Sequence, residues 1–261
     1  MNNTMRTVFK HFFLATFLLA GSVFHAAAVE QVASPQWLSY PAISPDGRSI
    51  AFAAGGQLWL TDAQGGEAVA LTSSDFYSTR PVWSPDGKSL AFACKRNGNF
   101  DVFVTTLAGD IPRRLTYHSE DDVPYAFSAD GNTIYFGSSR LGGPDTELVG
   151  AYHRSMQLYT IPATGGTTQL LLPTPAHDVA VSPDGKNLVY DNCPIYENEW
   201  RKGAVSDGTR DLWLFDFSTG KHRQLTSNRG EDRDGFFAPD GKSVYYVSEQ
   251  HGSSFNVWHT A

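Results

Sequence analysis

Apolar residues occur along this chain in short runs, and turn residues such as Gly, Pro, Asp and Ser interrupt them about every ten positions. Short runs bounded in this way are typical of β-strands. The segment Ser89–Ala93 is apolar on both of its alternating faces, as expected for a strand that lies between two other layers. The chain also holds 24 glycines and 14 prolines, enough for many turns. The pattern predicts an all-β fold.

One tetrapeptide is present in five copies. It reads Ser-Pro-Asp-Gly at 44–47, 84–87 and 182–185, Ser-Ala-Asp-Gly at 128–131 and Ala-Pro-Asp-Gly at 238–241. Successive copies are 40, 44, 54 and 56 residues apart. A propeller blade of four strands needs roughly 40–45 residues, so the later repeats contain insertions. The period predicts a β-propeller of four-stranded antiparallel blades.

The tetrapeptide has the chemistry of a tight turn. Pro presets its own φ, Asp bonds to nearby backbone, and Gly adopts the positive φ that closes a hairpin. Each copy should therefore join the first two strands of a blade. A third strand follows with an aromatic residue in a fixed place, namely Trp59, Phe103, Tyr159, Trp213 and Trp258.

The fifth repeat stops at Ala261, before a fourth strand. The sequence thus predicts five blades, of which the fifth is incomplete. Residues 30–39 could supply the missing strand and close a five-bladed ring, because propellers often pair their two ends. Alternatively, the chain is a fragment of a longer protein.

The first 28 residues have the pattern of a signal peptide. Arg6 and Lys10 precede an uncharged apolar run from Phe12 to Phe24, and three alanines end at Ala28. We expect cleavage after Ala28, export to the periplasm or cell envelope, and no stable membrane insertion afterwards. The alternative, a retained membrane anchor, is disfavoured because the run is short for a bilayer.

Charge excludes one class of partner. Of the 20 basic and 27 acidic residues, the expected cleavage removes two basic ones, which leaves a net charge of −9 for residues 29–261. Such a surface repels nucleic acid. The two cysteines, Cys94 and Cys193, occupy similar places in the second and fourth repeats, so a blade should separate them and prevent a disulfide.

Longer stretches resemble a known family. The Ser-Pro-Asp-Gly hairpins and Leu-Thr strand ends are similar to the WD40-like repeats of TolB and of tricorn-type peptidases. The segments 114–125, 139–144 and 196–202 resemble the N-terminal propeller of bacterial tricorn-like serine peptidases. In that family the propeller precedes a peptide-binding module and a serine peptidase domain, and usually has six blades. The resemblance implies a propeller at 29–261 that is truncated before a further blade and the peptidase.

Catalytic and metal signatures are missing from the sequence. The chain has no Gly-x-Ser-x-Gly nucleophile turn, and none of its eight histidines forms a pair at zinc-ligand spacing. Glu231, Asp232 and Asp234 lack the alternating oxygen ligands of a known calcium loop. We therefore expect no catalytic residue, metal or cofactor in this chain, and leave open whether the whole protein is an enzyme.

Topology indicates where a ligand should bind. The a-b and c-d turns, which join first to second and third to fourth strands, lie on one face and are tight. The opposite face, formed by the b-c and d-a connections, has two insertions, at 138–155 and 191–209. On it we expect charged and aromatic residues suited to peptide capture: Arg80, His118, Asp122, Arg140, His177, Asp178, Tyr196, Glu199, Trp200, Arg201, Asp232 and Arg233. The alternative role of the Asp and Arg residues is to tie blades together.

The resulting hypothesis is a non-catalytic propeller that recognises or gates peptides, or unfolded protein, for a tricorn-like serine peptidase of the cell envelope. A first alternative is a stand-alone TolB-like scaffold that binds other proteins in the periplasm. A second is a propeller with its own active site in the channel mouth, which the missing signatures disfavour.

Overall fold

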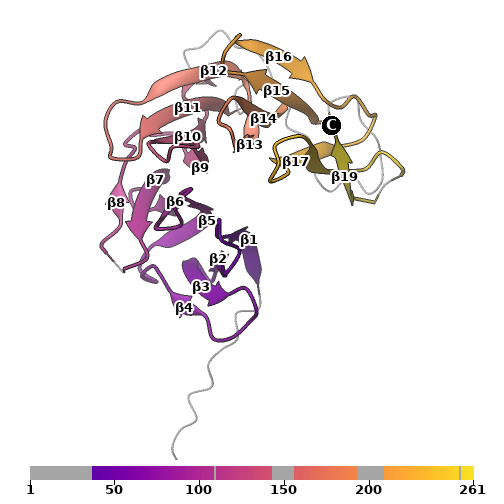
Figure 1. Ribbon diagram of the computed structural model, residues 1–261. Helices are drawn as coiled ribbons and strands as arrows, with labels where there is room; N and C mark the ends of the chain where they lie inside the picture. Colours follow the sequence, from indigo (N-terminus) through magenta and orange to yellow (C-terminus); the bar gives the residue numbers. More distant parts are fainter. Residues whose placement is uncertain (1–36, 109, 143–155, 193–208, 253) are drawn as a thin grey trace, which may run out of the picture. The chain divides into compact units, whose positions relative to one another are not determined.

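The computed structural model confirms an all-β propeller of five blades (Figure 1). It describes residues 37–108, 110–142, 156–192, 209–252 and 254–261, all within the compact unit 35–261. Each blade is an antiparallel sheet of strands that are consecutive in the sequence. Among the described residues four sheets have four strands and the fifth has three, in agreement with the prediction of an incomplete fifth blade.

The strands of the first two blades are β1 (Leu38–Ile43), β2 (Ser49–Ala54), β3 (Gln57–Asp62), β4 (Val69–Ala70), β5 (Tyr77–Trp83), β6 (Ser89–Lys95), β7 (Phe100–Thr106) and β8 (Arg113–Arg114). The third blade has β9 (Asp122–Phe127), β10 (Thr133–Ser138), a short 3-10 turn η1 (Arg140–Gly142), β11 (Gln157–Pro162) and β12 (Gln169–Pro175). The last two blades comprise β13 (His177–Val181), β14 (Asn187–Asn192), β15 (Asp211–Asp216), β16 (Lys221–Gln224), β17 (Asp232–Phe237), β18 (Val244–Ser248) and β19 (Asn256–Thr260).

The repeated tetrapeptide forms the predicted a-b hairpin. In the first blade the Ser44 hydroxyl donates to the Asp46 carboxylate at 2.6 Å and accepts from the Ser49 amide at 2.9 Å. Gly47 closes the turn with a φ of 72°. The same hydroxyl-to-carboxylate bond recurs in the next three blades, and it lowers the pKa of each turn aspartate. The fifth blade has Ala238 in place of this serine.

Hairpins of neighbouring blades touch one another. A methyl group on Gly131 would lie 3.5 Å from the Pro85 ring, and one on Gly241 would lie 3.5 Å from the Pro183 ring. At Gly185 the equivalent neighbour is the Ala129 methyl, at 3.1 Å. The second and fourth residues of the tetrapeptide therefore pack between blades as well as shaping the turn within one.

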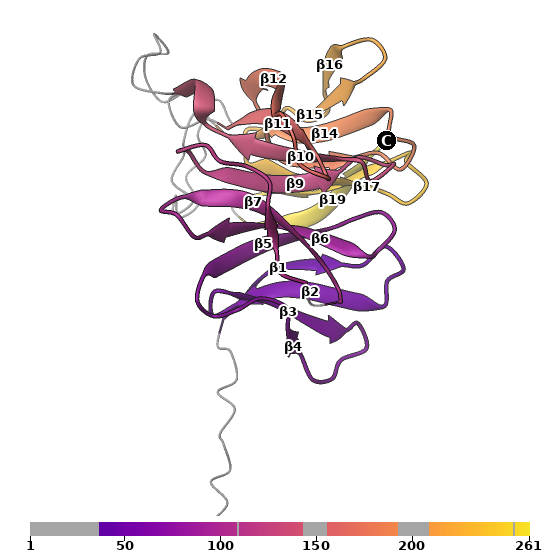
Figure 2. The ribbon, with the colours of Figure 1, turned by 90° about the vertical axis from the view of Figure 1, so that its left-hand side faces the viewer.

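Aromatic residues pair across the second and third strands of every blade. The predicted third-strand position faces an aromatic residue of the second strand in each sheet, in the pairs Phe52–Trp59, Phe92–Phe103, Phe136–Tyr159, Tyr190–Trp213 and Tyr246–Trp258. Four apolar clusters fill the spaces between successive blades. Figure 2 shows the sheets lying one above the next, as this packing requires.

Cys94 is a buried free thiol at the end of β6. Cys193, which we do not expect to pair with Cys94, and residues 1–28, where we expect a signal peptide, lie outside the described residues. Within the described part of the chain, no helix is long and apolar enough to span a bilayer.

Candidate functional site

The first strands of the blades surround a central cavity. Strands β1, β5, β9, β13 and β17 contact one another in that order, and they lie innermost in Figure 1. Residues from all five line a cavity of about 370 Å³. This central cavity is the one place where all five blades present side chains to a shared space among the described residues.

An irregularity in the backbone directs side chains into the central cavity. Each innermost strand shifts register against its neighbour near the same position. Four residues before the a-b turn stand Tyr40, Arg80, Pro124, Asp178 and Asp234. All but the proline have a left-handed backbone, with φ between 45° and 56°. Such a conformation costs a non-glycine residue of order 1 kcal/mol or more, and residues of this kind cluster at functional sites.

Arg80 and Asp178 bridge the cavity. The guanidinium Nη1 lies 2.9 Å from the Asp178 carboxylate, and the two side chains are 34% and 23% exposed. The Arg80 guanidinium also lies over the Tyr40 ring, 4.6 Å from its centre. Next to them the Tyr125 hydroxyl contacts the Met156 sulfur at 3.2 Å, and burial raises the pKa of this tyrosine. Charged and aromatic groups thus meet within one cavity.

Three carboxylates gather beside this ion pair. One oxygen from each of Asp178, Asp191 and Asp234 lies within 4.8 Å of the others. Asp191 is fully buried near the end of β14, where its Oδ2 accepts from the Asp234 amide at 3.0 Å. Burial, reinforced by the charge of Asp178, raises the pKa of Asp191 well above its usual range. Burial and the same neighbour also raise the pKa of Asp234.

The carboxylate group has no signature in the sequence. Its members come from β13, β14 and β17, so they are separated by many residues and by a blade boundary. Only the position of Asp178 and Asp234, four residues before the turn, repeats along the chain. Asp191 is directly opposite His177 across the β13–β14 pair, which places both at the sheet end away from the a-b turn. Burial lowers the pKa of His177.

Asp122, Arg140 and His118 lie apart from the cavity-bridging pair. Asp122 is fully buried, and Arg140 binds both of its oxygens, at 2.6 and 3.3 Å. The Arg140 guanidinium also lies 5.2 Å from the centres of the Phe136 and Tyr159 rings. His118 accepts from the Glu120 amide through Nδ1 at 3.1 Å. Each of the three side chains is therefore held by residues that do not line the central cavity.

Asp232 and Arg233 open the innermost strand of the fifth blade. Asp232 is fully buried, and its Oδ2 accepts from the side-chain amide (Nδ2) of Asn228 at 2.8 Å. The Arg233 guanidinium lies 3.5 Å from the Asp234 carboxylate and over the Phe255 ring, 4.6 Å from its centre. Arg233 therefore borders the carboxylate group.

The expected location of several residues is corrected. They were assigned to the d-a connections, but the innermost strands begin earlier than the sequence suggested and contain Arg80, Asp122, His177, Asp178, Asp232 and Arg233. Turn residues mark strand ends clearly, whereas a bulged strand loses the apolar alternation that would mark its start. Four predicted residues of the second insertion lie outside the described residues: Tyr196, Glu199, Trp200 and Arg201.

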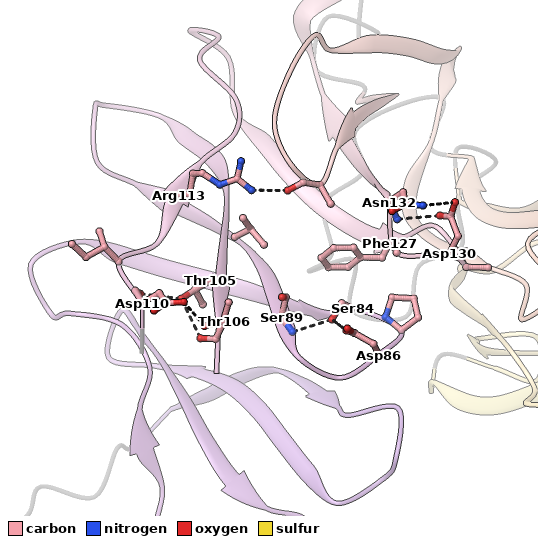
Figure 3. A pocket seen from close by; sticks show the side chains of 16 residues that line it. Ser84, Asp86, Ser89, Thr105, Thr106, Asp110, Arg113, Phe127, Asp130 and Asn132 are labelled. Carbon is pink, nitrogen blue, oxygen red and sulfur yellow. Dashed lines mark hydrogen bonds between the residues drawn. The ribbon is translucent and has the colours of Figure 1, made fainter. Parts of the chain in front are cut away.

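A larger cavity of about 760 Å³ opens on the face of the tight turns (Figure 3). It lies between the second and third blades, and the Arg113 side chain crosses it to donate to the Thr164 carbonyl. Similar cavities occur between the first and second and between the fourth and fifth blades. Sequence reasoning expected only turns on this face. Because the cavity recurs between blades, it follows from the repeat and is a weaker candidate than the central cavity.

Comparison with solved structures agrees with the fold. TolB from Acinetobacter baumannii has a TM-score of 0.63 and 22% identity, over 85% of this chain and 51% of that one. The tricorn protease crystal structure has a TM-score of 0.52 and 14% identity, over 82% of this chain and 20% of that one. At these identities the likeness shows the fold alone.

Comparison of sequences is more specific. An uncharacterized protein of Agrobacterium fabrum is 28% identical over 102 residues, which are 39% of this chain and 30% of that relative. The chain thus aligns with less than a third of that protein. Residues 35–261 match the family model described as the tricorn protease N-terminal beta propeller domain.

Proposed function

The chain belongs to the tricorn protease N-terminal β-propeller family, and we propose that it recognises peptides at its central cavity and guides them to a serine peptidase. The proposal assigns no catalytic residue to the described part of the chain. The family is named after a protease, and the proposed role belongs to its propeller.

One observation carries the proposal. Four left-handed residues at one repeated position direct Tyr40, Arg80, Asp178 and Asp234 toward a single space. The backbone feature repeats, but the side chains differ from blade to blade. The fold therefore provides the positions without dictating the chemistry, which is what a recognition site needs.

The cavity has groups that suit an extended peptide. Arg80 can exchange its ion pair for a peptide carboxylate or carbonyl, the aspartates can accept from amides, and Tyr40 and Phe236 offer apolar contact. Aromatic and arginine side chains are the commonest strong contributors at protein interfaces. The second insertion, which contains Trp200 and Arg201, follows β14 directly in the sequence and lies outside the described residues, so its part in binding is inferred from the sequence alone.

A second candidate is a protein-binding scaffold. The likeness to TolB over 85% of this chain shows the fold alone, and this fold is compatible with either role. We further propose that the protein is exported, as the basic and apolar pattern of residues 1–28 indicates. Mass spectrometry of envelope material should then find an N-terminus at Val29.

A peptide-binding experiment tests the proposal. Fluorescence anisotropy would be measured with a pool of labelled unstructured peptides, for the full chain and for two variants. Tyr40→Ala changes the cavity, and Trp200→Ala with Arg201→Ala changes the insertion. Each should weaken binding tenfold or more, a loss of about 1.4 kcal/mol per decade.

The matched control is Lys88→Ala on the exposed a-b hairpin of the second blade, which should leave binding unchanged. Melting temperatures of all variants separate lost binding from lost folding. Unchanged binding in both site variants would leave the scaffold role as the better account. Unfolding caused by the insertion variant would mean that Trp200 has a structural role.

A further inference from the structure

The carboxylate group of Asp178, Asp191 and Asp234 is not explained by the folding of any one blade. Its members come from strands of the fourth and fifth blades and meet at the wall of the central cavity. Like charges at this separation repel one another, and the repulsion is strongest where water is excluded. Their assembly calls for a positive group.

Two members already have a cationic neighbour. Arg80 lies 2.9 Å from Asp178, and Arg233 lies 3.5 Å from Asp234. Arg210 forms an ion pair with Glu231, and its positive charge also attracts the negative carboxylate of Asp191. Asp191 differs, because no cationic side chain of the described residues lies within ion-pair distance of its carboxylate.

Asp191 also has an oxygen without a partner. Its side chain is completely buried, and the Asp234 amide occupies Oδ2. No hydrogen-bond donor of the described residues reaches Oδ1. A buried carboxylate oxygen in this state costs several kcal/mol unless a ligand or a proton satisfies it. Oδ1 belongs to a carboxylate of this group, so a cation shared by the three side chains would give it a partner.

The group matches a hard cation. Carboxylate oxygens are the preferred ligands of calcium and magnesium. Oxygens bound to calcium at about 2.4 Å can be up to roughly 4.8 Å apart, whereas magnesium at about 2.1 Å needs a tighter set. The three oxygens, all within 4.8 Å of one another, lie inside the range that calcium allows.

We propose that Asp178, Asp191 and Asp234 form a calcium site at the wall of the central cavity, with the free Oδ1 of Asp191 as a ligand. Water and backbone carbonyls complete the coordination. An alkylammonium group, such as a lysine side chain, is a poorer fit, because its bulk must reach an oxygen that is buried. The proposal does not depend on peptide binding.

Calorimetric titration tests the site. The full chain is freed of metal with a chelator and titrated with calcium chloride, in parallel with Asp191→Asn and Asp234→Asn. We expect one calcium per chain, weaker or no magnesium binding, and a calcium-induced rise in melting temperature. Both substitutions should weaken calcium binding at least roughly tenfold.

The control is Asp75→Asn, which removes an exposed carboxylate far along the chain from the group and should leave the titration unchanged. Asp191→Asn keeps the acceptor for the Asp234 amide. If it still fails to fold, Asp234→Asn decides, because that side chain is 55% exposed. Absence of calcium binding by the unaltered chain would overturn the proposal. So would full binding by the folded variants, or methylammonium binding in place of calcium.

Discussion

Arg80 and Asp178 form an ion pair across the central cavity, although they are 98 residues apart and belong to the second and fourth blades. The third blade lies between those two in the sequence and in the ring. It has Pro124 at the equivalent position, which is short and uncharged. The pair therefore spans a blade, and it ties one side of the cavity to the carboxylate group on the other.

The first prediction concerns competition at Asp178. In Arg80→Gln the guanidinium no longer neutralises this carboxylate, so a calcium ion meets a more negative group and should bind several-fold more tightly. Without calcium the variant should lose about 1 kcal/mol of stability, because the pair is partly exposed. Calorimetry and urea unfolding in chelator measure the two effects. Weaker calcium binding would contradict the assigned ligands.

A second prediction separates structure from recognition. Arg140→Met leaves the fully buried Asp122 carboxylate without its counter-ion, which should cost roughly 3–5 kcal/mol in the free energy of unfolding. Peptide affinity per folded molecule should stay the same, because neither residue lines the central cavity. Urea unfolding and anisotropy on the same samples measure both quantities. A stable variant with lost peptide binding would instead place Arg140 in the recognition site.

Local turn chemistry explains why the fold could be predicted. The Ser44-to-Asp46 bond and the positive φ of Gly47 depend on residues within the tetrapeptide itself, so five copies of the motif locate five hairpins. The aromatic residue of each third strand, such as Phe103, lies opposite another aromatic at a fixed register. Both signals are local or periodic, and both are visible in one sequence.

The carboxylate group could not be predicted for the opposite reason. Asp191 lies near Asp234 because two blades pack together, and no spacing along the chain encodes that distance. The left-handed backbone of Tyr40 and Arg80 is equally hidden, since neither residue type favours it. A metal was not expected from the sequence because ligand motifs describe one element, whereas these oxygens come from three strands.

The third prediction concerns pH. Burial, aided by the nearby charge of Asp232, raises the pKa of Asp211 to about 6. The folded chain then holds a proton on Asp211 more tightly than the unfolded chain does. This contribution to stability is fully present below the ordinary pKa of the carboxyl and is lost as pH rises through about 6.

Asp211→Asn should therefore flatten the decline of stability between about pH 4 and 6. At pH 7 it should raise the free energy of unfolding by about 1 kcal/mol, a value reduced for partial solvent screening. Urea unfolding across that pH range, in chelator, measures the effect. A slope equal to that of the unaltered chain would rule out Asp211 as its source.

The fourth prediction compares two glycines with nearly the same backbone. Gly47 and Gly185 have φ of 72° and 70°, but a methyl group at Gly47 would touch nothing, whereas one at Gly185 would lie 3.1 Å from the Ala129 methyl. Gly47→Ala should cost about 1 kcal/mol from the backbone alone. Gly185→Ala should cost roughly 1 kcal/mol more, because two blades must separate slightly.

Chemical unfolding of the two single variants measures this difference directly, since the shared backbone cost cancels. Equal losses would show that the hairpins of the third and fourth blades tolerate the extra methyl, and that their contact is not tight.

The bulged position of the innermost strands also bears on how such proteins diverge. The backbone there is left-handed in blades whose side chains are tyrosine, arginine and aspartate, so the conformation accepts several residue types, with the proline of the third blade as the exception. The hairpins and aromatic pairs that hold the blades together lie elsewhere. A duplicated gene could therefore acquire a new ligand through a single codon change at one of these positions, without any compensating change in the strands that support it.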